Sequence, residues 1–144
     1  MQRCCDQRGT NMSRENVELI RGIYDAFAAG DVGGVLGRMS PDIVWNEAEN
    51  FPYADGNPYV GPQAIAEGIF VRCATEWDGF GVQPEEFLDA GDAVVVQGRY
   101  VGSYKATGKP MHAQMAHVWR IKDGKAVGFQ QYADTAQVAR VTEG

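Results

Sequence analysis

Two side chains of this 144-residue chain, His117 and Asp134, have the chemistry of proton transfer. An imidazole exchanges protons near neutral pH. A carboxylate in an apolar pocket is desolvated, so its pKa rises toward neutrality, as removal of a proton next to a carbonyl group requires. The predicted strand ladder separates the two groups by roughly 13 Å. We therefore predict two catalytic residues that act separately rather than as a directly bonded pair.

Each residue also has a structural interpretation. His117 lies in an apolar pattern, where a histidine can be a core residue that bonds Gln130 or a backbone carbonyl. Asp134 stands near the end of a predicted strand, where an aspartate can cap the turn that follows. Burial of the side chain, with open volume beside it, decides between the catalytic and the structural role.

Around these groups we predict a pocket for a small apolar molecule. Tyr24 and Tyr132 can donate a hydrogen bond to a substrate carbonyl or a developing enolate, although tyrosines at apolar positions are more often core residues. The predicted substrate-binding residues are Tyr24, Trp45, Tyr100, Met115, Trp119, Gln130 and Tyr132. A largely apolar cavity with a few convergent polar groups is the usual form of a ligand site.

The sequence has no cofactor or metal motif. Glu47, Glu49 and Asp55 lack the spacing of metal ligands, because hard cations need several oxygens fixed on one loop. No Gly-rich phosphate loop and no Ser or Cys nucleophile with a paired base is evident. We therefore predict chemistry that uses no cofactor and no metal.

Charge and composition disfavour several classes of partner. The net charge is −6 and no basic stripe is present, whereas a nucleic-acid-binding protein needs basic residues to neutralise phosphates. The longest apolar run is far shorter than the roughly 20 residues of a membrane helix. Cys4, Cys5 and Cys73 lack disulfide spacing, as is typical of a reducing compartment. We predict a cytoplasmic protein that binds neither nucleic acid nor membranes.

Hydrophobic periodicity predicts the elements that hold these residues. Ser13 is typical of a helix N-cap, and an apolar stripe at helical spacing follows as far as Gly30. Further helices are predicted over residues 32–39 and 63–77, and strands over 42–47, 82–88, 93–104, 111–121 and 126–134. Helices followed by a run of strands indicate an α+β fold with helices on one face of the sheet.

The length fits one domain. We predict that residues 1–12 form a disordered leader and that residues 13–140 form the domain, since Met12 followed by Ser13 is an alternative start of the chain.

The predicted hairpins assign the sheet faces. A two-residue loop at residues 123–124 places His117 opposite Gln130, and a loop at residues 107–108 places Tyr100 opposite Met115. The pocket face then carries Tyr100, Met115, His117, Trp119, Gln130, Tyr132 and Asp134. A slip of one residue would reverse the face of every side chain on a strand.

The opposite face mixes polar and apolar side chains. It carries Val95, Gln97, Arg99, His112, Gln114, Val118, Arg120, Phe129 and Gln131. This mixture suits a partly wet interface better than a dry core. We predict a homodimer through this outer face, and contact with another protein partner is the alternative use of the same surface.

Several segments, in their order and spacing, carry a family likeness. They are Glu15 to Asp31 with its final Ala-Ala-Gly-Asp, Asp42-Ile-Val-Trp45, Ala116-His-Val-Trp119 through Asp123-Gly-Lys125, and Tyr132-Ala-Asp134-Thr135. Together they resemble the SnoaL-like, ketosteroid isomerase-related branch of the nuclear transport factor 2-like superfamily, over residues 13–140. The resemblance implies a cone-shaped fold, in which a curved, mostly antiparallel sheet wraps around three N-terminal helices, commonly as a homodimer.

The resemblance also implies roles for single residues. SnoaL-like cyclases use a late-strand aspartate as acid or base, which Asp134 matches best, and His117 resembles the histidine often found on the preceding strand. Ketosteroid isomerases place their base on the first strand, where Asn46 stands here, with Glu47 one residue out of phase. Limonene epoxide hydrolase-like enzymes use an Asp, Arg, Asp set, but Arg99 is predicted to face away from the pocket. Steroid isomerisation and epoxide hydrolysis are therefore not supported.

We predict an isomerase, cyclase or lyase that shifts a proton on a small apolar carbonyl compound. The alternative is a non-catalytic carrier of a hydrophobic ligand, or a dimeric scaffold, in which the same groups are structural. The fold named by the resemblance hosts all of these functions and does not choose among them.

Overall fold

The computed structural model describes the backbone of residues 2–143 and the side chains of residues 13–143. The first half of the chain contains α1 (Gln2–Ala28), α2 (Val32–Leu36), β1 (Met39–Asn46), the 3-10 helix η1 (Pro52–Gly56), β2 (Tyr59–Val60), α3 (Pro62–Ile65), the π-helical turn η2 (Ala66–Phe70) and α4 (Val71–Glu76). The second half contains β3 (Trp77–Asp89), β4 (Ala93–Tyr104), β5 (Pro110–Lys122), β6 (Lys125–Ala133) and α5 (Thr135–Thr142). Among the described residues, no helix is both long enough and apolar enough to span a membrane.

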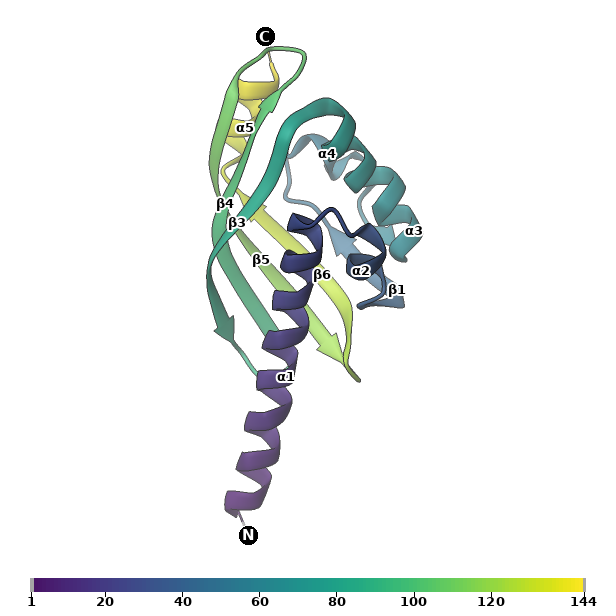
Figure 1. The fold of residues 1–144 in the computed structure, drawn as a ribbon, viewed down its shortest axis with the longest axis vertical. Coiled ribbons are helices and arrows are strands. Elements are labelled where there is room, and N and C mark those ends of the chain that lie inside the picture. The colour runs from purple at the N-terminus through teal and green to yellow at the C-terminus, as the bar shows by residue number, and fades with distance from the viewer. Residues whose placement is uncertain (1, 144) are drawn as a thin grey trace.

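The strands form a single curved sheet in the order β2-β1-β6-β5-β4-β3. All neighbouring strands are antiparallel except β1 and β6, which are parallel although they come from opposite ends of the chain. The sheet curves around α1, α3 and α4 (Figure 1). The predicted α+β class, with a mostly antiparallel sheet wrapped around N-terminal helices, is confirmed.

Several element boundaries differ from the prediction. The first helix begins at Gln2, so Ser13 lies inside it and is not an N-cap. The second helix ends at Leu36, and β1 begins at Met39, earlier than expected. Helix α5 and the short elements η1 and β2 were not predicted. The division into a leader of residues 1–12 and a domain of residues 13–140 stays a prediction, because the side chains of residues 1–12 lie outside the described part.

The predicted register between the last two strands is wrong by one residue. Lys122 pairs with Lys125 as expected, but a bulge between Arg120 and Ile121 shifts the pairing beyond it. His117 therefore lies opposite Gln131 instead of Gln130. An odd shift exchanges the two faces of a strand. The last strand thus turns a different set of side chains toward the helices, namely Phe129, Gln131 and Ala133.

The register between β4 and β5 is wrong by two residues. Their connection is longer than two residues, since Ser103 pairs with Pro110, and Tyr100 consequently lies opposite Ala113 instead of Met115. An even shift keeps each side chain on its face. Tyr100 and His117 therefore share the inner face, as predicted.

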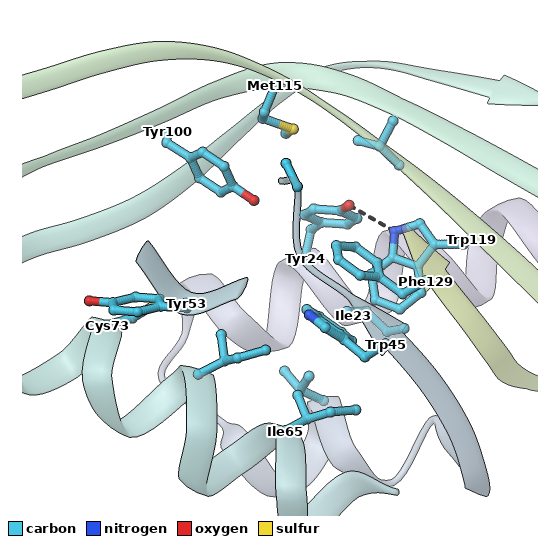
Figure 2. Packing of buried hydrophobic residues seen from close by; sticks show 14 of the residues in the cluster. Ile23, Tyr24, Trp45, Tyr53, Ile65, Cys73, Tyr100, Met115, Trp119 and Phe129 are labelled. Atoms are coloured by element: carbon cyan, nitrogen blue, oxygen red, sulfur yellow. Dashed lines mark hydrogen bonds between the residues drawn. The ribbon is translucent and has the colours of Figure 1, made fainter. Parts of the chain in front are cut away.

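Several aromatic side chains pack together in the core on that inner face (Figure 2). The rings of Trp45 and Phe129 stack with centroids 3.7 Å apart, and the Trp119 ring packs edge-on against each of them at 5.6 and 4.6 Å. Full burial of such a side chain contributes about 1.5–3 kcal/mol. Because Trp45 belongs to β1 and Phe129 to β6, this cluster joins the two parallel strands.

Candidate active site

A cavity of about 50 Å³ lies between the helices and the inner face of the sheet. It is lined by Ile23, Tyr24, Phe27, Val35, Trp45, Glu47, Phe51, Ile69, Phe70, Cys73, Phe80, Val82, Tyr100, His117, Trp119, Phe129 and Gln131. A single water occupies at least 10–15 Å³ on the same scale, so the cavity holds a few small atoms in this conformation. Most of the lining is aromatic or aliphatic, with a few polar groups.

The structure brings together part of the predicted site. Among the predicted residues, Tyr24, Trp45, Tyr100, His117 and Trp119 line the cavity. Four others do not line it, namely Met115, Gln130, Tyr132 and Asp134. Met115 is buried on the inner face, whereas Gln130 and Tyr132 lie on the outer face because of the bulge in β5.

His117 is held between two tyrosine hydroxyls. The Tyr24 hydroxyl lies 2.6 Å from Nδ1 and the Tyr100 hydroxyl 2.5 Å from Nε2. Burial lowers the pKa of His117 to about 3, so the ring is neutral at physiological pH. The predicted structural partners of His117, Gln130 or a backbone carbonyl, are wrong: both ring nitrogens are bonded, but to tyrosine hydroxyls.

The neutral ring leaves one tyrosine proton unused. A neutral imidazole has one N–H and one acceptor nitrogen, so one tyrosine donates to the ring and the other accepts from it. Each hydroxyl already accepts another bond, Tyr24 from Trp119 Nε1 at 2.9 Å and Tyr100 from Gln131 Nε2 at 2.7 Å. Whichever tautomer is present, the hydroxyl that accepts from His117 has no acceptor for its own proton among the described residues.

Gln131 fixes one end of this network. Its amide nitrogen donates to Tyr100, and its amide oxygen accepts from the backbone N–H of Ala48 at 3.0 Å. The side chain is only 2% exposed, so both ends of the amide have protein partners in a closed environment. The bond to Ala48 connects the network to the segment that carries Glu47.

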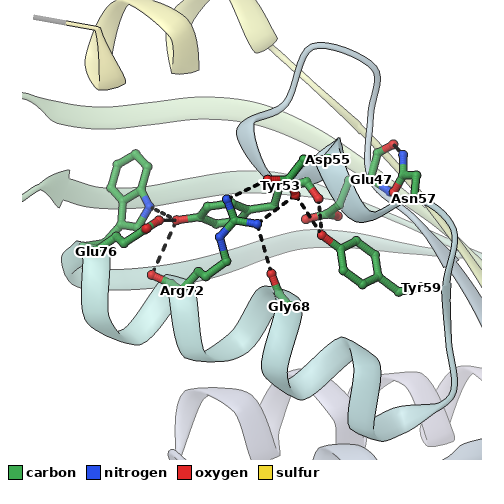
Figure 3. Close-up of polar contacts among 9 residues, drawn as sticks. Glu47, Tyr53, Asp55, Asn57, Tyr59, Gly68, Arg72 and Glu76 are labelled. Atoms are coloured by element: carbon green, nitrogen blue, oxygen red, sulfur yellow. Dashed lines mark hydrogen bonds and ion pairs between the residues drawn. The ribbon is translucent and has the colours of Figure 1, made fainter.

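Glu47 is a buried carboxylate in the wall of the cavity. It is 3% exposed, and its Oε2 accepts a hydrogen bond of 3.2 Å from Trp45 Nε1. Among the described residues, every side-chain nitrogen or oxygen that is fully buried has a hydrogen-bond partner. Oε1 of Glu47 has no such partner, so this oxygen itself is not fully buried. We infer that Oε1 is open to the cavity. Asn57 holds the backbone of Glu47 from both sides, with bonds of 2.8 and 2.9 Å (Figure 3).

The environment of Glu47 favours its protonated form. Burial raises its pKa to about 7, while the bond from Trp45 and the charge of Arg72 act in the opposite direction. Burial also raises the pKa of Tyr100, with the Glu47 charge as the next largest cause. The carboxyl group and the tyrosine–histidine network therefore interact electrostatically across one cavity.

The loop that covers Glu47 is tied to α4 (Figure 3). The Tyr53 hydroxyl donates to Glu76 at 2.6 Å and accepts from Trp77 Nε1 at 2.9 Å. Arg72 binds both carboxylate oxygens of Asp55, at 2.9 and 3.1 Å, and its guanidinium lies 4.2 Å from the centre of the Tyr53 ring. These contacts hold the loop, and with it the wall residue Phe51, against the cavity.

Glu47 and Gln131 were absent from the predicted site, and a signal existed for one of them. The alternation that places Ile43 and Trp45 inward places Glu47 on the same side, so period two predicts its direction. Gln131 and its neighbour Phe129 had no such signal, because the bulge between Arg120 and Ile121 reverses their face.

Asp134 caps α5. Its Oδ1 accepts the backbone N–H of Gln137 at 3.1 Å, the bond expected of an N-cap aspartate. We expect Asp134→Ala to lower the free energy of unfolding by about 1 kcal/mol, because the first turn of α5 loses this acceptor. Asp134→Asn is the control and should retain most of the stability. Urea denaturation measures both, and an equal loss in the two variants would contradict the capping role.

Comparison with known proteins places this geometry in a family. A model of the SnoaL-like domain matches residues 20–129. A nuclear transport factor 2-like protein from Burkholderia thailandensis E264 is 36% identical, with a TM-score of 0.83, over 87% of this chain and 95% of that one. TerC, crystallised with polyporic acid, is 30% identical, with a TM-score of 0.80, over 90% and 99%. No curated protein matches the chain.

A more distant structure has the same fold. A putative SnoaL-like polyketide cyclase from Jannaschia sp. CCS1 is 17% identical, with a TM-score of 0.78, over 92% of this chain and 95% of that one. The family resemblance and the nuclear transport factor 2-like fold predicted from the sequence are thereby confirmed.

Proposed function

The chain belongs to the SnoaL-like domain family, and we propose that it is an enzyme that shifts a proton on a small, mostly apolar carbonyl compound. One observation carries the proposal. A buried carboxyl group with a pKa of about 7 and a tyrosine hydroxyl with an unused proton line the same apolar cavity. A base and a hydrogen-bond donor in a largely apolar site are the two groups that enolisation requires. TerC, a relative crystallised with polyporic acid, supports a small organic molecule as the ligand of this chain.

The proposed reaction begins with the carbonyl oxygen of the substrate beside the free tyrosine proton. Ionised Glu47 removes a proton from the carbon next to the carbonyl through Oε1. The electron pair of the broken C–H bond forms a C=C bond, and the π pair of the carbonyl group moves onto its oxygen. The hydroxyl of Tyr24 or Tyr100 stabilises the resulting enolate, while His117 orients that hydroxyl. Protonated Glu47 then returns the proton to the same carbon or, where a conjugated carbonyl compound forms a dienolate, to the carbon at the far end of the dienolate, and no cofactor takes part.

Proton exchange in deuterated water tests this function without knowledge of the natural substrate. We expect the protein to catalyse exchange of the α-protons of small ketones, observed by NMR. The rate should increase with pH and level off above about 7, because Glu47 acts as a base only after it has lost its proton. Ketones that bind without any exchange above the buffer rate would contradict the proposal.

The second candidate is a non-catalytic carrier or scaffold, favoured by one observation. Both nitrogens of His117 are already bonded to protein hydroxyls, so this residue has no free position for a substrate. In the carrier interpretation the network is structural and the cavity only holds a ligand. Binding of ketones without exchange is the outcome that would select it.

We further propose a cytoplasmic homodimer through the outer face of the sheet. Val44 and Tyr132 are 41% and 56% exposed on the strands β1 and β6. Apolar side chains that are exposed together on a sheet are typical of an interface. Light scattering should give twice the 15.7 kDa mass of the chain, and a value of one mass would contradict the dimer.

A further inference from the structure

The cavity at Glu47 is smaller than an ordinary ligand site. Its volume is about 50 Å³, whereas pockets that enclose an organic ligand measure roughly 300–1,000 Å³. A carbonyl group with its adjacent carbons fits this space, but a larger substrate does not. The rest of such a molecule must lie in a neighbouring space.

A second hollow of about 310 Å³ adjoins the cavity, and we call it the vestibule. It is lined by Phe27, Gly30, Val32, Phe70, Cys73, Ala74, Trp77, Gly79 and Phe80. These residues come from α1, the turn after it, α2, η2, α4 and β3. None of these side chains carries a charge. Val32, 46% exposed, and exposed Ala74 lie where the vestibule meets solvent.

The cavity and the vestibule share a wall. Phe27, Phe70, Phe80 and Cys73 line both spaces. The Phe27 ring packs edge-on against Phe70 at 5.6 Å and against Phe80 at 6.4 Å, and all three phenylalanines are half-buried. Phenyl rings in contact at their edges separate the spaces without any polar bond between them. Rotation of these side chains would give up ring contacts, including those of Phe70 with Trp45 and of Phe80 with Trp77 and Tyr100, but would break no hydrogen bond.

We propose that the vestibule is a second ligand subsite, which binds the apolar tail of an elongated carbonyl compound whose oxygen lies in the cavity beside the tyrosine–histidine network. The proposal rests on the proposed function for the position of the carbonyl group. It narrows the substrate class to ketones or related carbonyl compounds with an extended, uncharged hydrocarbon portion. In this arrangement the ligand passes from the cavity, which holds its carbonyl group, to the vestibule, which holds its tail, at Phe27, Phe70 and Phe80.

A series of methyl ketones of increasing length tests the subsite in the full chain. We expect affinity, measured by titration calorimetry, to rise about fourfold for each methylene group that enters the vestibule, the gain typical of burying one methylene. Ala74→Trp fills the vestibule and should abolish this gain, while 2-butanone binding stays unchanged. Thr75→Trp is the matched control, because Thr75 is the exposed neighbour on α4 and does not line the vestibule.

The outcomes separate the subsite from the catalytic proposal. A chain-length gain that persists in Ala74→Trp, or that is absent in the wild type, would overturn the vestibule. If Ala74→Trp no longer binds 2-butanone, Val32→Asp replaces it, because a charge on this half-exposed residue disfavours an apolar tail without filling the core. If the affinity of the wild type rises with chain length but no α-proton exchange is seen, the second subsite is supported and the proposed enzymatic function is rejected.

Discussion

Glu47→Gln is expected to lower kcat for α-proton exchange by roughly 10²–10⁴-fold, the usual contribution of a positioned general base. The amide has the shape of the carboxyl group and can still accept the bond from Trp45 Nε1. It cannot take up a proton at pH 7, so the fold should remain and the chemistry should stop. NMR exchange rates at saturating ketone measure the effect.

Glu76→Gln is the matched control for this variant. Glu76 also accepts a side-chain hydrogen bond, from the Tyr53 hydroxyl at 2.6 Å, but it does not line the cavity. We expect its kcat to stay within a few-fold of the wild type. Similar rates in Glu47→Gln and the wild type would exclude Glu47 as the base, and an equal loss in both variants would indicate general damage to the site.

The stability of the protein should show two opposing pH dependences from buried groups of one cavity. Glu47 has a pKa raised from 4.5 to about 7, so the folded state holds its proton more tightly than the unfolded state. The stabilisation is complete below pH 4.5 and declines by about 3 kcal/mol as pH rises to 7. His117 has a pKa lowered from 6.5 to about 3, so its contribution declines by about 5 kcal/mol as pH falls from 6.5 to 3.

Between pH 4.5 and 6.5 the two pH dependences of the free energy of unfolding cancel. In this range the folded state binds about one proton more than the unfolded state at Glu47 and about one proton fewer at His117. Glu47→Gln removes the pH dependence that comes from Glu47 and leaves that of His117. The free energy of unfolding of this variant should therefore rise steadily from pH 3 to 6.5, whereas the wild-type curve flattens above pH 4.5. Urea denaturation across this range measures both curves, and their difference cancels other titrating groups. Parallel curves would show that the Glu47 pKa is not raised.

Much of the fold could be predicted from the sequence because local patterns determine it. The change from helical to alternating period places the strands, and β4 has the predicted bounds, 93–104. Face assignments are less secure, because they depend on the register of each hairpin. In β5 a single bulge, which no residue type announces, moved Gln130 and Tyr132 to the outer face and brought Gln131 inward.

The residues of the candidate site could be predicted where the alternation of side chains along one strand was enough to assign them to the inner face. His117 and Trp119 alternate on β5 and face the cavity, as expected. Tyr24 and Tyr100 were placed in the same pocket as His117, but their hydrogen bonds to its ring were not predicted. Tyr24 comes from α1 and Tyr100 from β4, and only tertiary packing brings them to the ring. Glu47 was not predicted as a site residue, because comparison with ketosteroid isomerases placed the catalytic base at the position of Asn46. The alternation of the strand, which turns Trp45 inward, nevertheless predicts that Glu47 also points inward.

The parallel pairing of β1 with β6 determines when the sheet can be completed during protein synthesis. Trp45 rests on Phe129, and Val44 to Asn46 bond to residues 128–130, which are translated much later. Until then the nascent chain presents an unpaired strand edge and a tryptophan without its stacking partner, the kinds of surface that chaperones shield. Contacts between such distant segments also make folding slow, because a long loop must close first. Release of the last strand from the exit tunnel is therefore the step that completes the ligand-binding interior.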